Sequence, residues 1–328
     1  MGGGNQENDD PMAAGPTFAA VRDAQERIAP HIHRTPVMRS SSLDTRAGAR
    51  LFLKCENLQK TGSFKIRGAA NAIFSLSDSS AARGVVTHSS GNHGAAVAYA
   101  ARRRGIPSWI VVPRGAPEVK QRAIADFGGT IVSCDNTLES RQAAAKVILE
   151  RTGAALIHPY DNDAVIAGQA TATVELLEDA GELDVVLAPV SGGGLLGGTA
   201  IAAQSLQPGI RVIGCEPALA DDALRSLSSG QLQKNTCMDT IADGLRASLS
   251  ERTFAILRQR LDGIVAISEE EILEAMRFVW ERMKLLIEPS SAVAVAAVIF
   301  GKAGAEGKRI GIVLSGGNVD VGRFFERD

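Results

Sequence analysis

Short apolar runs alternate with longer helical patterns along most of this chain, and this alternation limits the fold more than any other feature. The first series lies within residues 84–158. It predicts strands at 84–87, 109–112, 130–133 and 155–158, and helices at 92–104, 117–127 and 138–152. The strand runs are rich in Val, Ile and Leu, which is typical of buried parallel sheets. We therefore expect one compact parallel α/β unit here.

A second series follows the first. It predicts strands at 184–190, 211–215, 263–267 and 309–314, and helices at 163–180, 195–204 and 291–300, with a further helix opened by the capping box of Ser268 and Glu271. Earlier helices are expected at 18–28 and from Lys65 to about residue 76. The predicted fold class is α/β with two open parallel-sheet domains. The small domain covers residues 83–158, and the large domain covers 16–82 and 159–328. Residues 1–15, which are glycine-rich and acidic, are expected to form a disordered tail.

Composition excludes several classes of protein. The net charge is −2, so no basic excess points to nucleic acid or to an anionic membrane. No apolar run is long enough to span a bilayer. The four cysteines (Cys55, Cys134, Cys215 and Cys237) are scattered and form no Cys-x-x-Cys pair. That spacing fits reduced thiols in a cytoplasmic protein rather than a disulfide scaffold or a zinc site.

Lys65 is the most informative single residue. It follows a turn at Gly62, and Ser63 is expected to cap the helix, which puts Lys65 in the first helical turn. A cation at that end opposes the helix dipole. The dipole and any burial both disfavour the charged form, so this lysine is well placed to become a neutral amine nucleophile. A solvated lysine at a helix start is the alternative.

A glycine-rich loop after the strand at 184–190 is the strongest local signal. Consecutive glycines at the start of a helix let backbone N–H groups approach an anion, so a phosphate site is expected, with a tight turn as the alternative. Through Gly192, Gly194 and Gly197 the loop also fits the dinucleotide pattern, and Glu216 ends the next strand near the place of a ribose-binding acid. A nicotinamide (NAD)-dependent oxidoreductase is therefore a rival.

Two more glycine loops follow predicted strands, one at 89–94 and one at 315–318. Each could be a turn on its own, but loops that follow strands of open α/β sheets tend to converge on one crevice. A nicotinamide enzyme gives no role to Lys65 or Ser315. Pyridoxal phosphate accounts for all of these features, because it needs a lysine for an imine, backbone donors for its phosphate and a partner for its ring nitrogen.

Five motifs carry a family resemblance over nearly the whole chain, at residues 60–68, 87–93, 241–244, 287–290 and 314–320. In them the chain resembles the fold-type II pyridoxal phosphate enzymes, the tryptophan synthase β-like group, and within it the branch of serine racemases and dehydratases. The resemblance implies that Lys65 forms the imine with the cofactor. Further cofactor contacts implied by it come from Asn92, Ser191, Gly192, Gly193, Gly194, Leu195, Gly244 and Ser315. Its implied substrate contacts come from Ser89, Asn92, His93, Arg141 and Ser248, and the small domain is expected to close on the substrate.

Ser90 separates two reactions of this family. Elimination needs one base, whereas racemisation needs a second acid or base on the opposite face of the substrate. Related threonine dehydratases usually carry Ala at the place of Ser90, so the resemblance implies a racemase of L- and D-serine that also releases pyruvate and ammonia. The alternative is that Ser90 is only a small residue in a tight loop. Tyr160 departs from animal members, which carry Asn there, so fine substrate contacts are not carried over on that wall, and a packing residue is the alternative.

A metal site is also expected. Glu216, Asp221 and Asp222 follow a strand and offer clustered hard oxygens, which suit Mg²⁺ or Ca²⁺. The resemblance specifies the carboxylates of Glu216 and Asp222 and the carbonyl of Ala220, with Mn²⁺ as another candidate ion. An exposed acidic loop is the alternative reading of these residues.

The resemblance implies further properties and leaves other functions open. A homodimer that acts on a small amino acid is expected, and a nucleotide is a candidate effector. A serine/threonine dehydratase or a hydroxyaspartate-type racemase or dehydratase, without significant serine racemisation, is the nearer alternative. The NAD-dependent oxidoreductase and a non-catalytic binding protein on an enzyme fold are more distant ones.

Overall fold

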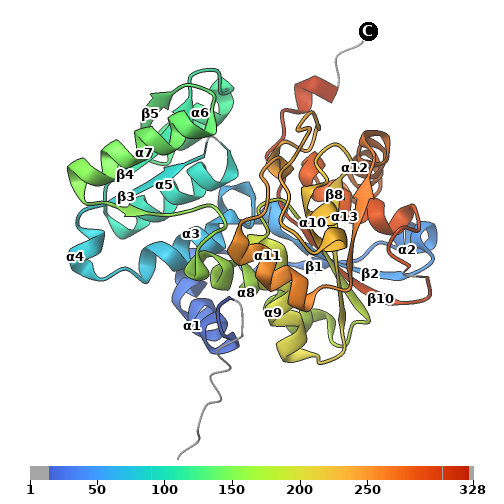
Figure 1. Ribbon diagram of the computed structural model, residues 1–328. Coiled ribbons are helices and arrows are strands. Elements are labelled where there is room, and N and C mark those ends of the chain that lie inside the picture. Colours follow the sequence, from blue (N-terminus) through green and yellow to red (C-terminus); the bar gives the residue numbers. More distant parts are fainter. Residues whose placement is uncertain (1–14, 90, 305, 325–328) are drawn as a thin grey trace, which may run out of the picture.

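The computed structural model describes residues 15–89, 91–304 and 306–324, and these form two sheets flanked by helices (Figure 1). The predicted α/β class with parallel sheets is confirmed. The predicted tail over residues 1–15 lies outside the described residues except for Gly15. Within the described ranges, no helix is long and apolar enough to cross a membrane.

The larger sheet has six strands, counted over the described residues, in the order β1-β2-β10-β7-β8-β9. Its strands are parallel except for β1, which pairs antiparallel with β2. The strand bounds are β1 Val37–Met38, β2 Arg50–Cys55, β7 Val185–Pro189, β8 Arg211–Pro217, β9 Gly263–Ile267 and β10 Arg309–Leu314. The first and last of the long strands in sequence, β2 and β10, are neighbours at the same side of this sheet.

The smaller sheet is parallel throughout, with the order β5-β4-β3-β6. Its strands come from one continuous part of the chain: β3 Val85–His88, β4 Ser108–Pro113, β5 Thr130–Cys134 and β6 Ala155–Leu156. Figure 1 shows this sheet and its helices as a separate lobe beside the larger one.

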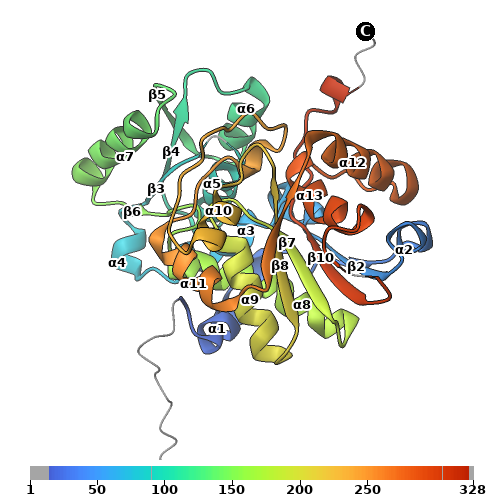
Figure 2. The same cartoon turned by 45° about the vertical axis from the view of Figure 1, so that its right-hand side comes forward.

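Helices cover both faces of each sheet. In chain order they are α1 Phe18–Ile28, α2 Ser41–Ala47, α3 Lys65–Phe74, α4 Asp78–Ala81, α5 Asn92–Arg104, α6 Glu118–Asp126, α7 Leu138–Thr152, α8 Asp163–Ala180, α9 Gly194–Leu206, α10 Asp222–Ser229, α11 Glu251–Arg260, α12 Glu269–Met283 and α13 Pro289–Ile299. On the larger sheet, α2, α12 and α13 share one apolar core with one face, while α8, α9 and α11 pack on the other (Figure 2). On the smaller sheet, α5 and α6 cover one face and α7 the other.

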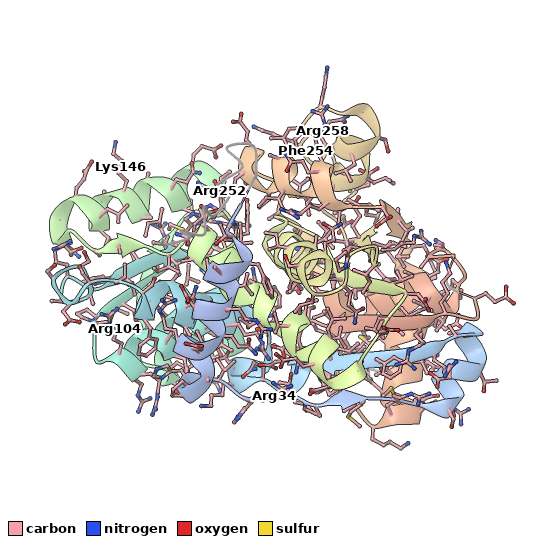
Figure 3. All side chains as sticks on the ribbon, turned by 90° about the horizontal axis from the view of Figure 1, so that it is seen from below. Arg34, Arg104, Lys146, Arg252, Phe254 and Arg258 are labelled. Atoms are coloured by element: carbon pink, nitrogen blue, oxygen red, sulfur yellow. The ribbon has the colours of Figure 1, made fainter. Side chains whose placement is uncertain are left out.

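Helix α3 lies where the two lobes meet. Its apolar residues Ile66, Ala69 and Ile73 join the same core as α5 of the smaller lobe. On its other side it approaches α8 closely, because a Cβ added at Gly168 would lie 2.7 Å from the Cα of Gly68. Arg104, labelled in Figure 3, reaches from α5 to the carbonyl oxygens of Ile73 and Leu76 at the end of α3. Both lobes therefore position the helix that begins at Lys65.

Candidate active site

Lys65 is the first residue of α3, as the sequence predicts, but the cap is different. Ser63 is not the cap: Phe64 occupies that position, without a side-chain hydrogen bond to the helix. Ser63 is extended and fully buried, and it forms an isolated bridge with Gly316. Its hydroxyl has no partner among the described residues. The contact with the loop after β10, rather than a cap, fixes the chain before Lys65.

The environment of Lys65 favours a neutral amine. Its Nζ donates a hydrogen bond to the carbonyl oxygen of Pro159 at 3.1 Å and lies 5.0 Å from the ring centre of Phe64. Burial lowers the pKa of Lys65 to about 8, and the nearby charge of Glu288 offsets part of that effect. A lysine with this pKa has a useful neutral fraction near neutral pH. Lys65 can therefore act as a nucleophile and afterwards as a base.

Glu288 is the acid that faces Lys65, and it is not among the site residues that the sequence predicts. It immediately precedes α13 and is buried. Its two carboxylate oxygens accept hydrogen bonds from Nδ2 of Asn92 at 3.0 and 3.2 Å. Burial raises the pKa of Glu288 to about 7. An acid just before a helix as apolar as α13 is the one sequence signal that could have indicated it.

Asn92 connects the two lobes at the site. It begins α5 after β3, and its Oδ1 accepts a hydrogen bond from Nδ2 of Asn318 at 2.9 Å. Asn318 follows β10 and also donates to the carbonyl oxygen of Thr61 at 2.7 Å. The loops after β3 and β10 and the turn before Lys65 thus meet, as expected for loops at the carboxyl ends of parallel strands.

The glycine loop lies between β7 and α9, and Gly193 caps the helix with a left-handed φ of 87°. Tyr160 packs on this loop, because a Cβ added at Gly192 would lie 2.2 Å from its ring. Pro159, next to Tyr160, accepts the hydrogen bond from Lys65. One short segment therefore contacts both the glycine loop and the lysine. Only glycine fits at position 192, and Leu195 continues the first turn of α9 behind it.

Ser315 and Gly244 are both tied to the beginning of α13. Ser315 is buried directly after β10, with its Oγ 3.3 Å from Oγ of Ser291. Its carbonyl oxygen accepts a hydrogen bond from the backbone N–H of Phe64 at 2.9 Å. The N–H of Gly244 donates to Oγ of Ser290 at 3.0 Å. The same turn that carries Glu288 therefore holds both residues near the start of α3.

His93 is the buried member of the predicted substrate group. Its Nε2 lies 3.0 Å from the carbonyl oxygen of Ile157, so this nitrogen carries the proton and donates. Its Nδ1 is buried without a partner among the described residues. Burial first, and then Lys65, hold the pKa of His93 well below its usual value. Next to this helix, Oγ of Ser89 accepts a hydrogen bond from the N–H of Gly91 at 3.4 Å.

Two of the other predicted substrate residues, Arg141 and Ser248, bond to partners away from Lys65. Arg141 donates to Oδ1 of Asn136 at 2.8 Å, at the start of its own helix α7. Ser248 accepts a hydrogen bond from the N–H of Asn235 at 3.0 Å. The described contacts of these two side chains do not include Lys65. Ser90, the predicted second catalytic residue, lies outside the described residues.

The predicted metal ligands form a pair of buried acids, called here the acid pair (Glu216 and Asp222). Glu216 is near the end of β8 and accepts hydrogen bonds from the N–H groups of Leu224 at 2.7 Å and Ala223 at 3.3 Å. Asp222 accepts one from the N–H of Leu249 at 3.0 Å. Burial raises the pKa of Glu216 to about 8 and that of Asp222 to about 6.

The acid pair fits a hard cation through its donor chemistry. Two buried carboxylates with raised pKa values favour either protons or a cation between them. Ala220, whose carbonyl is the third predicted ligand, is also buried on the connection between them. Within the described ranges, no three His, Cys, Asp or Glu side chains gather as a metal site. A cation here would therefore need carbonyl oxygen and water as well.

The assembled residues define a class of enzyme. A buried lysine with a lowered pKa lies beside a glycine loop that suits a phosphate, which is what a phosphorylated aldehyde cofactor requires. The unpartnered hydroxyl of Ser63 and the unpartnered Nδ1 of His93 leave polar atoms there for a ligand. The residues present thus fit pyridoxal phosphate.

Comparison with known proteins agrees with this class. The family model described as "Pyridoxal-phosphate dependent enzyme" matches residues 28–316, so the chain belongs to the family of pyridoxal phosphate-dependent enzymes. The serine racemase of Dictyostelium discoideum is 50% identical over 316 residues, which are 95% of this chain and 97% of that protein. The β-hydroxyaspartate dehydratase of Paracoccus denitrificans is 43% identical over 309 residues, 94% of this chain and 98% of that one. The structure of maize serine racemase superposes with a TM-score of 0.93 at 46% identity, covering 95% of this chain and 96% of that chain.

Proposed function

We propose that this protein interconverts L- and D-serine with pyridoxal phosphate and also converts serine to pyruvate and ammonia. The observation that carries the proposal is Lys65, whose pKa is lowered to about 8 between Pro159 and Glu288, in a chain half identical to a serine racemase over nearly its full length. Pyridoxal phosphate supplies the electron sink that makes the proton on Cα of an amino acid removable.

The residues divide the work of holding the cofactor. Lys65 would bind its aldehyde carbon, and the backbone N–H groups of residues 191–195 would bind its phosphate at the start of α9. Asn92 would contact the ring hydroxyl, Ser315 the ring nitrogen and Gly244 the ring face. The support for this arrangement is that the loops bearing Asn92, Gly244 and Ser315 contact the start of α3 or the turn at Glu288. The glycine loop contacts Tyr160, which is next to the Pro159 that accepts the hydrogen bond from Lys65.

Racemisation is proposed to use Lys65 on one face of the substrate and Ser90 on the other. Replacement of Ser90 by Ala is expected to reduce racemisation at least about a hundredfold, because a positioned acid or base contributes on the order of 10² to 10⁴ in rate. Some pyruvate formation from L-serine persists, since elimination needs one base. Ser79→Ala, which changes an exposed serine of α4, is the matched control. Unchanged racemisation in Ser90→Ala would refute the assignment.

Substrate binding is proposed at the start of α5, where Ser89, Asn92 and the N-terminal N–H groups near His93 favour a carboxylate. Arg141 and Ser248 would reach the substrate only if residues 83–158 move toward the larger lobe. Two contacts that already join the lobes support such a closure, Asn92 to Glu288 and Lys120 to Asp243. Serine is the proposed substrate because the relatives above that are named for serine are the more similar ones.

A dehydratase of hydroxyaspartate is the second candidate, favoured by the 43% identical relative from Paracoccus. One assay separates the two. D-Serine and pyruvate formed from L-serine, and oxaloacetate formed from L-threo-3-hydroxyaspartate, are measured with Mg²⁺ and with a chelator. D-Serine as a major product supports the racemase, and oxaloacetate without D-serine supports the dehydratase. A colourless protein that stays inactive with added pyridoxal phosphate would contradict both.

A divalent cation, Mg²⁺, Ca²⁺ or Mn²⁺, is proposed at the acid pair, supported by the two buried carboxylates described above. A homodimer in the cytoplasm and a nucleotide effector are proposed on resemblance to the family. Four free cysteines, three of them buried, agree with a reducing compartment. Sedimentation with and without ATP tests the assembly and the effector.

A further inference from the structure

Residues 247–250, called here the strap, lie between the glycine loop and the acid pair. They are irregular in conformation and join the short 3₁₀ turn at Asp243–Leu245 to α11. None of the chemistry described so far requires this segment except for one predicted contact from Ser248. Its hydrogen bonds nevertheless lead in two directions, to the predicted phosphate site and to the predicted cation site.

On the glycine-loop side, the strap holds Ser191. The hydroxyl of Ser191 donates to the carbonyl oxygen of Ala247 at 3.0 Å and accepts from the N–H of the same residue at 3.0 Å. A serine hydroxyl can donate one hydrogen bond, and here the acceptor is the carbonyl oxygen of Ala247. The side chain of Leu249 packs on Gly193 of the same loop, because a Cβ added at Gly193 would lie 2.9 Å from Cδ2 of Leu249.

On the other side, the strap holds Asp222. The N–H of Leu249 donates to Oδ2 of Asp222 at 3.0 Å. Oγ of Ser248 accepts from the N–H of Asn235 at 3.0 Å, and Oδ1 of Asn235 accepts from the N–H of Asp222 at 3.3 Å. Leu249 therefore contacts the acid pair with its backbone and the glycine loop with its side chain.

The far end of the strap is fixed as well. Ser250 caps α11 and forms a capping box with Thr253. Thr253 also packs on the glycine loop, since a Cβ added at Gly193 would lie 2.7 Å from the Cβ of Thr253. With the end at α11 held in this way, the strap cannot slide along its length. A displacement of the Asp222 carboxylate must therefore move Leu249 and with it the loop contacts.

We infer that the strap is a positioning element through which a cation at Glu216 and Asp222 sets the geometry of the glycine loop and hence its hold on the cofactor phosphate. Ser191 in this arrangement is a positioning residue: its hydroxyl joins the loop to the strap, and its phosphate contact is left to the backbone. The inference rests on the proposed function, because the ligand of the loop is the phosphate of pyridoxal phosphate.

The test uses the full-length holoenzyme and measures how fast the cofactor leaves. The protein is transferred to cofactor-free buffer with either Mg²⁺ or a chelator, and the loss of the visible absorbance of bound cofactor is followed. For the original sequence, Mg²⁺ is expected to slow release at least about fivefold, the lower end of typical coupling between two sites. In Ser191→Ala this dependence falls below about twofold, although Mg²⁺ still raises the melting temperature because the acid pair is intact.

Three comparison variants sharpen the test. Ser140→Ala, which removes a serine hydroxyl from α7, keeps the full dependence on Mg²⁺. Ser191→Thr retains the hydroxyl, so its cofactor release is expected to keep the full dependence on Mg²⁺ as well. Leu249→Val, which shortens the contact with Gly193, reduces it even if Ser191→Ala does not fold. The same Mg²⁺ dependence in Ser191→Ala or in Leu249→Val as in the original chain would overturn the inference, as would release that is independent of Mg²⁺ in the original chain. Absence of visible absorbance in the original chain would instead contradict the proposed function.

Discussion

Two groups of buried charges in the larger lobe differ in one respect, the presence of matching cations. The first, called here the charge network, consists of Lys54, Glu56, Arg67 and Glu175, with Nε of Arg67 2.7 Å from Glu56 and Nζ of Lys54 2.6 Å from Glu175. It has two positive and two negative side chains. The second group is the acid pair, which has no buried cation of its own among the described contacts. Its carboxylates accept hydrogen bonds from backbone N–H groups, and Asp222 also accepts one from the side chain of Asn235 and lies near the cation of Arg225.

The difference shows in the protonation of the acids. Within the charge network, hydrogen bonds and charges from Arg67 and Lys54 outweigh burial, and the pKa of Glu175 lies below its usual value. At the acid pair, burial dominates, and the pKa values of Glu216 and Asp222 rise. A buried acid that is paired with a buried cation has its charge balanced within the protein, so its role is structural. A buried acid without one requires a proton or an ion from solution, so it marks a candidate site.

The charge network is expected to tolerate the loss of a partner poorly, which is the largest effect predicted here. In Arg67→Met, Glu56 and Glu175 share Lys54 as their remaining close cation, and breaking a buried pair costs about 3–5 kcal/mol of unfolding free energy. Urea unfolding measures it. Arg258→Met changes an exposed arginine of α11 (Figure 3) and should stay within about 0.5 kcal/mol. If Arg67→Met loses as little unfolding free energy as this control, the charge network does not depend on its matched cations and the comparison of the two groups fails.

The acid pair should instead respond to added cation. A cation at 100 times its dissociation constant stabilises a protein by about 2.7 kcal/mol, and Asp222→Asn is expected to lose that gain. Melting temperature with Mg²⁺ and with a chelator measures it. Asp221→Asn, the neighbouring acid that pairs with Arg225, should keep the full shift. If Mg²⁺ raises the melting temperature of Asp222→Asn as much as that of the original chain, the cation does not bind at this site.

The pH dependence of stability should have opposite signs in the two groups. The folded-state pKa of Glu216, about 8, lies above its usual value of 4.5. Between these values the unfolded chain has released the proton and the folded chain has kept it, so stability falls as pH rises, by up to about 1.4 kcal/mol per pH unit. The pKa of Glu175 is lowered, so its contribution is present above its usual value of 4.5 and is lost as pH falls through the folded-state pKa.

Glu216→Gln isolates the first of these slopes. In a chelator, the unfolding free energy of the original chain should fall more steeply than that of the variant between about pH 5 and about pH 8. Glu288, whose pKa is also raised, contributes equally to both proteins and cancels in the difference. Parallel curves for the two proteins would show that Glu216 is ionised throughout this range, as expected for Glu175 with its lowered pKa.

The smallest expected effect comes from a neutral member of the charge network. Oγ1 of Thr171 accepts a hydrogen bond from Arg67 at 3.1 Å. Thr171→Val removes this bond while Arg67 keeps both carboxylates, so a loss of about 1 kcal/mol is expected in urea unfolding. Thr130→Val, at an exposed strand position, is the control. A loss as large as in Arg67→Met would mean that the network depends on its geometry more than on its charge balance.

The sequence predicted the long regular helices and most strands well, and it missed several short elements and β2, in which a buried charge interrupts an apolar run. The bounds expected for 92–104, 138–152, 263–267 and 309–314 are those of α5, α7, β9 and β10. Strand β2, which lies between β1 and β10 in the larger sheet, was not predicted. It contains Lys54, which looks like a surface residue until its partner Glu175 is known. Because that partner lies more than a hundred residues away, no local pattern could show it.

The candidate site divides in the same way. Loops that follow strands were predictable, because their glycines and their position are local properties. Glu288, the packing of Tyr160 on Gly192 and the bonds from Ala247 to Ser191 depend on contacts between distant segments. Ser63 was misassigned as a cap for the same reason, since its bridge to Gly316 joins two ends of the chain. The assignments of cofactor, substrate and metal contacts stay predictions.

The pairing of β2 with β10 has a consequence for biosynthesis. The smaller sheet comes from one continuous stretch, so it can form while the ribosome is still translating the rest. Strand β2 leaves the ribosome early but waits for β10, its neighbour, until residues 309–314 have been made. Until then its edge is exposed to other nascent chains. Lys65 and Ser315, which follow β2 and β10 in the chain, come together in the same final step. A prematurely terminated chain would therefore lack an assembled site.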